Sequence, residues 1–179
     1  MNIMESAIKK EARDLIVEAI EEYERMIDNK KDVSVAAFIN LAFDYWQCTD
    51  FGFAVAHTLD DKLQQKAFRR SLEVLDQAEQ CHPSFPEIRF WRLYFRFITL
   101  GSNEINDAID SILADPKCSI IPFFFLFMIN RPLDQKKVIE LSGEIEKTST
   151  YKHRYIKSIL GSHPWGLPSH CSPPLPSPE

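Results

Sequence analysis

The sequence predicts an all-α protein made of antiparallel helical hairpins, and three observations carry this prediction. The 179 residues include only 5 glycines, and long stretches without Gly or Pro favour helices over a turn-rich β fold. Apolar residues recur at steps of three and four along most of the chain, as in helices with one buried face. Two expected helices, 33–48 and 86–100, are almost wholly apolar, whereas 61–81 and 103–115 are amphipathic. A buried helix followed by an outer helix, twice over, predicts stacked hairpins.

The segment 86–100, PEIRFWRLYFRFITL, is the expected centre of the core. As a helix it is apolar around most of its circumference, so neighbours must cover it on several sides, and Trp91 is expected to be buried. Its narrow polar stripe is Arg89, Arg92 and Arg96, which lie within about 60° of one another on a helix. Gly101 is expected to end the helix.

In the first half of the chain we expect one amphipathic helix over 4–28 and, after a polar break, the apolar helix 33–48. Asp32 or Ser34 caps the second of these, and Asn40, Asp44 and Gln47 form its polar stripe.

The segment 49–59 is expected to be a loop folded onto the core. Gly52 marks a break there, and Phe51, Phe53 and Val55 alternate like a short buried extended piece.

In the second half, a helix runs from Asp60 or Asp61 to Cys81, and prolines then turn the chain into the central helix. The remaining expected helices are 103–115, a buried one from Pro122 through Met128, one that starts at Pro132, and 151–160. The run 120–129, IIPFFFLFMI, is interrupted by a proline and is far shorter than the ~20 residues that span a bilayer. We therefore interpret it as the core of a third hairpin.

The chain divides into a helical domain over 1–160 and a Pro-rich tail over 161–179. Six prolines and two glycines in the tail give it little apolar area to bury. Because ordering each residue costs roughly 1–2 kcal/mol of backbone entropy, we expect the tail to be disordered or extended.

Composition and cysteine spacing narrow the class of protein. A net charge of −5 argues against nucleic acid as a partner, and no segment indicates a membrane partner. The four cysteines, Cys48, Cys81, Cys118 and Cys171, form no C-x-x-C pair, so we expect reduced thiols. The first residues lack the apolar run of a secretory signal, and a cytoplasmic location follows as an expectation.

The alternation of buried and outer helices resembles the tetratricopeptide repeat. In the first helical pair the residues that carry the resemblance are Asn40-Leu41-Ala42, Tyr45, Ala78 and Pro83. In the second they are Phe90, Leu93, Phe97, Leu100-Gly101, Ala108 and Ile112. The pattern departs from the family by about 17 extra residues inside the first pair. The resemblance implies a short α-solenoid with a concave groove that receives peptides; a compact helical bundle is the alternative.

In that family the side of the inner helices that carries these polar stripes borders the groove. The resemblance therefore implies that Asn40, Asp44, Arg89, Arg92 and Arg96 bind a partner protein or peptide. Arginine pairs with carboxylates in a bidentate manner, so an acidic segment suits the stripe. The alternative is that the arginines form a solvated face paired with Glu87 or Asp44.

We find no sequence pattern that indicates catalysis, a metal or a cofactor. The histidines His57, His82, His153, His163 and His170 lack the spacing of a zinc site or a catalytic set. The expected function is thus protein binding, as an adaptor, a chaperone or an inhibitor of the immunity type, and not enzymatic.

Two alternatives belong to other classes. A small helical enzyme with a dispersed active site would show a deep polar pocket with a buried Glu or His of perturbed pKa. An RNA-binding helical repeat would need Trp91 and Tyr94 to be exposed beside the arginines.

Overall fold

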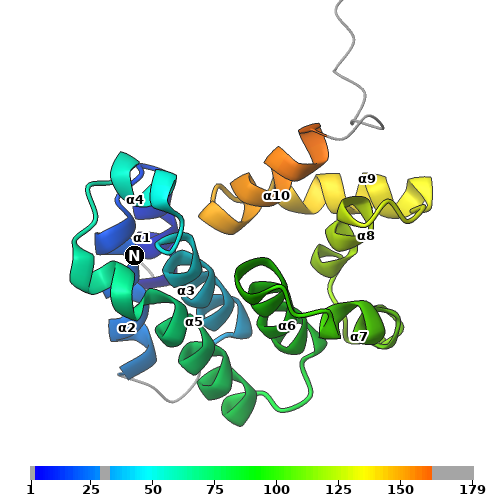
Figure 1. The fold of residues 1–179 in the computed structure, drawn as a ribbon, viewed down its shortest axis with the longest axis horizontal. Helices are drawn as coiled ribbons and strands as arrows, with labels where there is room; N and C mark the ends of the chain where they lie inside the picture. The colour runs from blue at the N-terminus through cyan, green and yellow to red at the C-terminus, as the bar shows by residue number, and fades with distance from the viewer. Residues whose placement is uncertain (1–2, 29–32, 163–179) are drawn as a thin grey trace, which may run out of the picture.

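The computed structural model describes residues 3–28 and 33–162. These residues form ten α-helices and one 3-10 turn, which confirms the predicted all-α class (Figure 1). In chain order the elements are α1 (Ile3–Glu11), α2 (Ile16–Asp28), α3 (Val35–Gln47), α4 (Phe51–Ala56), α5 (Asp61–Cys81), α6 (Pro86–Leu100), α7 (Glu104–Leu113), η1 (Ile121–Phe123), α8 (Phe124–Met128), α9 (Gln135–Ile145) and α10 (Tyr151–Ser162).

Helices that are near one another in sequence pack in pairs. α1 lies along α2, α3 along α5, and α6 along α7, while contacts of α2 with α3 and of α5 with α6 join the pairs. The last helix, α10, returns to pack against α3 and α8 (Figure 1). The result is a series of hairpins closed by α10, a form that a helical bundle and a short solenoid can both take.

Three predicted helix ends are confirmed in atomic detail. Ser34 Oγ accepts a hydrogen bond from the Ala37 N–H at 3.4 Å, and Asp60 Oδ1 accepts one from the Leu63 N–H at 2.6 Å. These side chains therefore cap α3 and α5, and each is one of the two candidates that the sequence left open. Gly101 ends α6 with φ of 69°, a left-handed conformation that glycine adopts without strain.

The single helix expected over 4–28 is wrong, because the chain turns back after α1. Asp14 has φ of 60°, and the Leu15 N–H donates to the Lys10 carbonyl oxygen at 3.0 Å. Aspartate is one of the few residues besides glycine that adopt this conformation routinely. α2 then packs along α1, so the continuous apolar period covers two short helices.

The loop expected over 49–59 is wrong where α4 forms. Asp50 Oδ1 accepts a hydrogen bond from the Phe53 N–H at 2.7 Å and so caps the helix. Phe53 packs against the core, whereas Phe51 and Val55 are 80% and 63% exposed. Residues 51 and 55 are four apart and share a helix face, so their alternation does not mark a buried extended segment.

The helix expected from Pro132 begins three residues later. The Asp134 carboxylate accepts a hydrogen bond from the Lys136 N–H at 3.1 Å, which fixes the start of α9 at Gln135. α10 continues through Ser162, so the first two residues of the expected tail 161–179 are helical. The rest of that prediction concerns residues outside the described part of the chain.

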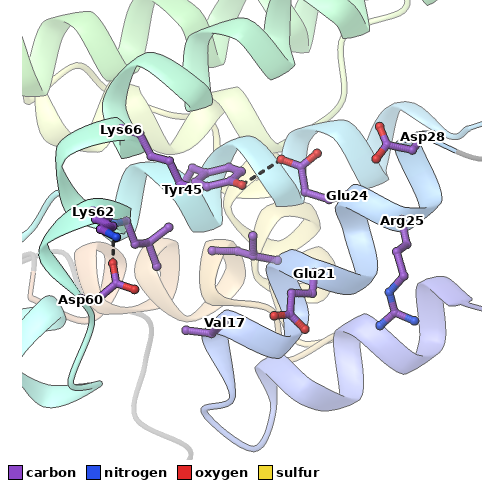
Figure 2. Close-up of a pocket in the computed structure, with 11 residues that line it drawn as sticks. Val17, Glu21, Glu24, Arg25, Asp28, Tyr45, Asp60, Lys62 and Lys66 are labelled. Atoms are coloured by element: carbon purple, nitrogen blue, oxygen red, sulfur yellow. Dashed lines mark hydrogen bonds between the residues drawn. The ribbon is translucent and has the colours of Figure 1, made fainter.

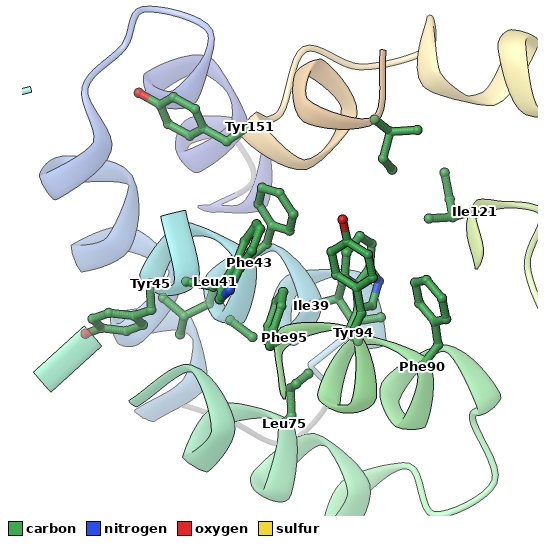
Figure 3. Close-up of a cluster of buried hydrophobic side chains, with 14 of the residues drawn as sticks. Ile39, Leu41, Phe43, Tyr45, Leu75, Phe90, Tyr94, Phe95, Ile121 and Tyr151 are labelled. Carbon is green, nitrogen blue, oxygen red and sulfur yellow. The ribbon is translucent and has the colours of Figure 1, made fainter. Parts of the chain in front are cut away.

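Aromatic side chains from α3, α6 and α8 form the centre of the core. Figure 3 shows those of α3 and α6, among them Phe43, Tyr94 and Phe95. Trp91 is fully buried, as predicted, and its ring lies 5.4 Å from that of Phe43 and 5.8 Å from that of Phe124. The segment 120–129 is confirmed as a core segment, since most of its side chains from Ile120 to Leu126 are buried. At the end of α6, however, Leu100 is 61% exposed, so neighbouring elements do not bury the last turn of this helix.

Cys48, Cys81 and Cys118 are free thiols, as predicted, and Cys171 lies outside the described residues. Among the described helices, none combines the length and the apolar character that a membrane crossing requires.

Candidate functional site

Two of the predicted binding residues, Asn40 and Asp44, lie inside the protein. They are 3% and 1% exposed, which contradicts the expectation that they form a stripe beside an open groove. Asn40 Nδ2 donates to Tyr23 Oη of α2 at 3.1 Å. Among the described residues, neither carboxylate oxygen of Asp44 has a hydrogen-bond partner. The stripe is covered because α2 and α10 both pack against α3.

Arg92 and Arg96 connect α6 to the outer helices. Their partners lie on α5 and α7: Asp76 at 2.8 Å and Glu79 at 2.6 Å from Arg92, and Glu104 at 3.0 Å from Arg96. The interpretation of the stripe as a paired, solvated face therefore has support, although Glu87 and Asp44 are the wrong partners. Water screens the charges of these three carboxylates and two guanidinium groups, so each pair adds little stability.

The structure does not bring the five predicted binding residues together. Arg89 is exposed at the start of α6, whereas Asn40 is buried against α2 and Arg92 points to α5. The polar stripes of α3 and α6 thus serve different neighbours. A binding role for these residues stays a prediction.

The face between α3 and α6 is filled by α10 of the same chain. Tyr155 Oη lies 2.6 Å from Tyr94 Oη, and the Tyr155 ring packs against Phe43 and Trp46 with centroids 5.5 and 5.3 Å away. Ile156, the next residue of α10, is fully buried. This face therefore belongs to the core.

A buried acid lies where α1, α2 and α10 meet. Glu11 is fully buried and accepts hydrogen bonds of 2.6 Å from the Tyr23 hydroxyl and from the backbone N–H of Tyr151. Burial raises the pKa of Glu11 to about 7, against the lowering effect of these two hydrogen bonds. Burial, reinforced by the negative charge of Glu11, also raises the pKa of Asp44 well above its usual range.

Sequence reasoning missed Glu11 as a buried group. The only signal is its position four residues after Ala7, which is also fully buried, so both lie on one face of α1. Its partner Tyr151 is 140 residues away in the chain. No local pattern predicts that contact.

An open cleft of about 610 Å³ lies between α2 and α5 (Figure 2). Its central carboxylate, Glu24, accepts a hydrogen bond from Tyr45 at 2.8 Å and a bidentate pair from Arg70 at 2.7 and 2.9 Å. Although burial raises the pKa of Glu24, these hydrogen bonds outweigh it and hold the pKa below its ordinary value. The carboxylate is thus already engaged in joining three helices, which makes this cleft a structural feature.

A second cavity, of about 640 Å³, opens where α3 ends, α4 begins and α6 ends. Trp46, Phe53 and Tyr155 give it aromatic walls. The Trp46 Nε1–H donates to Thr99 Oγ1 at 3.0 Å, so the indole presents its apolar ring without an unpaired donor. The cavity is mixed in character, because Gln47, Thr49, Asp50 and Thr99 line it together with the aromatic residues and Ile98.

Large apolar side chains are exposed around this cavity, and we call them the apolar rim: Phe51, Val55, Ile98 and Leu100. Ile98 lines the cavity itself, while Phe51 and Leu100 each follow a lining residue in the chain. Large exposed apolar side chains beside a cavity make this region a candidate interaction site.

Among the described residues, no group of His, Cys, Asp and Glu side chains is arranged to hold a metal ion. Comparison with known proteins adds no assignment: no protein-family model matches the chain, and no curated protein or solved structure is similar to it. The resemblance to tetratricopeptide repeats therefore rests on the residues quoted above.

Proposed function

We propose that the protein acts by binding another protein, and that the apolar rim is the contact surface. The observation that carries this proposal is the exposure of Phe51, Val55 and Leu100, each by more than three-fifths, beside an aromatic-walled cavity. Exposed large apolar side chains reduce solubility unless a partner covers them. A cavity beside them accepts an anchoring side chain, which is how most interface energy is concentrated.

The partner that suits this surface presents an apolar helix face. The apolar rim spans the ends of two helices, and apolar side chains spaced by three and four residues on a partner helix would meet both. The acidic partner expected from the arginine stripe has less support, because Arg92 and Arg96 are already paired within the chain. The protein would serve as an adaptor, a chaperone or an inhibitor, and its free thiols favour the cytoplasm.

Photo-crosslinking tests this proposal. The photoreactive residue p-benzoylphenylalanine is placed at Phe51 and, in a second variant, at Leu100, and the proteins are irradiated in extract of the source cells. A matched control carries it at Ile139, which is 65% exposed on α9, away from the apolar rim. We expect the same partner at positions 51 and 100 and none at 139. Equal capture at all three positions, or none at 51 and 100, contradicts the proposal.

The structure gives less support to the two alternatives. Trp91 and Tyr94 are fully buried, so an RNA-binding face would lack its stacking aromatics. Glu11 and Asp44 have raised pKa values, as a catalytic acid would, but neither lines any of the cavities described. A general acid must reach its substrate, so these two groups favour a structural role. His153, by contrast, is buried, has a pKa lowered to about 4 by burial and lines a cavity, and it is an observation that favours the enzyme alternative.

A further inference from the structure

A third cavity, of about 600 Å³, lies among α1, α3, the first turn of α6 and the connection from α9 to α10. Ile8, Val35, Ile39 and Ile121 give it apolar walls. Phe85 and Lys147 at its edge are exposed, so the cavity opens to solvent. Its volume lies within the range of about 300–1,000 Å³ that small-molecule sites occupy.

Lys152 of α10 brings a buried positive charge to this cavity. It is 6% exposed, and its Nζ lies 3.9 Å from Glu87 Oε1, which is too long for a hydrogen bond. The Glu87 carboxylate already accepts from Trp91 Nε1 at 3.1 Å and from Ser119 Oγ at 2.6 Å. Within the described chain the ammonium therefore donates no hydrogen bond, although it has three protons to donate.

Asn40 of α3 brings an unpaired acceptor to the same cavity. The Tyr23 hydroxyl donates to Glu11, so its oxygen accepts from Asn40 Nδ2. This fixes the orientation of the amide, and within the described chain Asn40 Oδ1 is buried without a hydrogen-bond partner. Buried amide oxygens are nearly always satisfied, so this one has a hydrogen bond to make beyond those within the described residues.

The remaining charges around the cavity balance. Glu144 and Lys147 pair with each other at 2.5 Å, and Glu87 lies opposite Lys152. Burial lowers the pKa of His153 to about 4, so its ring, held at 2.6 Å from Thr150 Oγ1, is neutral at pH 7. A ligand without net charge is therefore favoured over an ion.

We propose that this cavity binds an apolar amino acid, or a close relative that combines a carboxylate, an N–H donor and an apolar side chain. The carboxylate accepts hydrogen bonds from Lys152, the amino group donates to Asn40 Oδ1, and the side chain packs against Ile39 and Ile121. Such a ligand accepts from the Lys152 ammonium and donates to Asn40 Oδ1, and it adds no net charge to the cavity. This site is separate from the apolar rim and does not depend on the protein-binding proposal.

Isothermal titration with three matched probes tests the proposal: phenylalanine, phenylalaninamide, which lacks the carboxylate, and 3-phenylpropionate, which lacks the amino group. We expect the full-length protein to bind phenylalanine and each truncated probe at least about tenfold more weakly, because each loses a hydrogen bond to a buried group. If no probe binds, water alone satisfies Lys152 and Asn40, and the proposal is overturned. Equal binding of all three probes also overturns it.

Variants locate the site. Lys152→Met should weaken phenylalanine binding at least about tenfold and remove the preference over phenylalaninamide. Lys157→Met is the matched control, because Lys157 lies on the same helix, pairs with Glu146 and is 58% exposed. Where Lys152→Met does not fold, Asn40→Leu takes its place and should remove the preference over 3-phenylpropionate. Unchanged binding in either folded variant overturns the assignment of these residues.

Discussion

Glu11, the last residue of α1, accepts a hydrogen bond of 2.6 Å from the backbone N–H of Tyr151, the first residue of α10. The first and last described helices are thereby joined across 140 residues of sequence. A carboxylate at a helix N-terminus satisfies a free backbone donor and interacts favourably with the helix dipole. Arg154 adds to this junction by donating to the Glu11 carbonyl oxygen at 3.1 Å. The contact fixes α10 in the position where it covers α3.

Removal of the Glu11 carboxylate should destabilise the whole fold. Glu11→Ala leaves the Tyr151 N–H and the Tyr23 hydroxyl without their acceptor in a buried site, and we expect a loss of about 2–5 kcal/mol in the free energy of unfolding. Urea denaturation followed by circular dichroism measures it. Glu18→Ala is the control, because Glu18 is exposed on α2 and its loss should cost almost nothing. Equal stability of the two variants would show that the junction carries no energy.

The same carboxyl should make stability depend on pH. The pKa of Glu11 is about 7 in the folded protein and near 4.5 when unfolded, so between these values the folded state binds more protons. Its contribution is complete below about pH 4.5, falls as pH rises, and is lost above about pH 7, with a slope of at most about 1.4 kcal/mol per pH unit. Stability relative to Glu11→Gln, measured by urea denaturation from pH 4.5 to 8, should therefore decline and then level off.

If the unfolding free energies of wild type and Glu11→Gln change in parallel with pH, the pKa of Glu11 is not raised. Titration of Glu24 does not disturb this comparison. Its pKa is lowered by Arg70 and Tyr45, so its contribution is present above about pH 4.5 and is lost only as pH falls further. The two carboxyl groups thus act in opposite directions and in separate pH ranges.

The sequence predicts what local chemistry decides. Ser34, Asp60 and Gly101 end helices by contacts within a few residues, and their roles follow from residue type and position. The turn at Asp14 contains no Gly or Pro, so the sequence does not indicate it. Asp50 caps α4, but Gly52 two residues later indicates a break and not the start of a helix. At Asp14 the packing of α2 along α1 breaks a helix that the apolar period predicts as continuous. At Asp50 one side-chain hydrogen bond starts a helix where a loop is predicted.

The candidate sites depend on contacts between residues far apart in the chain, which the sequence does not predict. Asn40 and Asp44 form a regular polar stripe, which in most helices faces solvent. Here α10, more than 100 residues later, covers the helix that carries them. Lys152 and His153 likewise appear as ordinary polar residues of a short amphipathic helix, yet they are 6% and 9% exposed. Tertiary packing alone turns Asn40, Lys152 and His153 into lining of a cavity and buries Asp44.

Truncation of Trp91 should be among the most costly substitutions in the chain. Its ring is fully buried among other aromatic rings, and its Nε1–H donates to Glu87 at 3.1 Å. We expect Trp91→Ala to cost about 3–5 kcal/mol. Leu100→Ala, a change on the same helix at a side chain that is 61% exposed, should cost far less. If denaturant melts show Trp91→Ala as stable as wild type, the core position of α6 is wrong.

The arginine stripe should contribute little to stability, which makes it suitable for a binding test. Arg92 and Arg96 pair with exposed carboxylates, so Arg89, Arg92 and Arg96 replaced together by Ala should cost less than about 2 kcal/mol in a denaturant melt. A larger loss would show that the cross-helix pairs are structural. Because the triple variant stays folded, it can be compared with wild type in capture from cell extract. A partner retained by both agrees with binding at the apolar rim, whereas a partner lost only from the triple variant places the contact on the stripe.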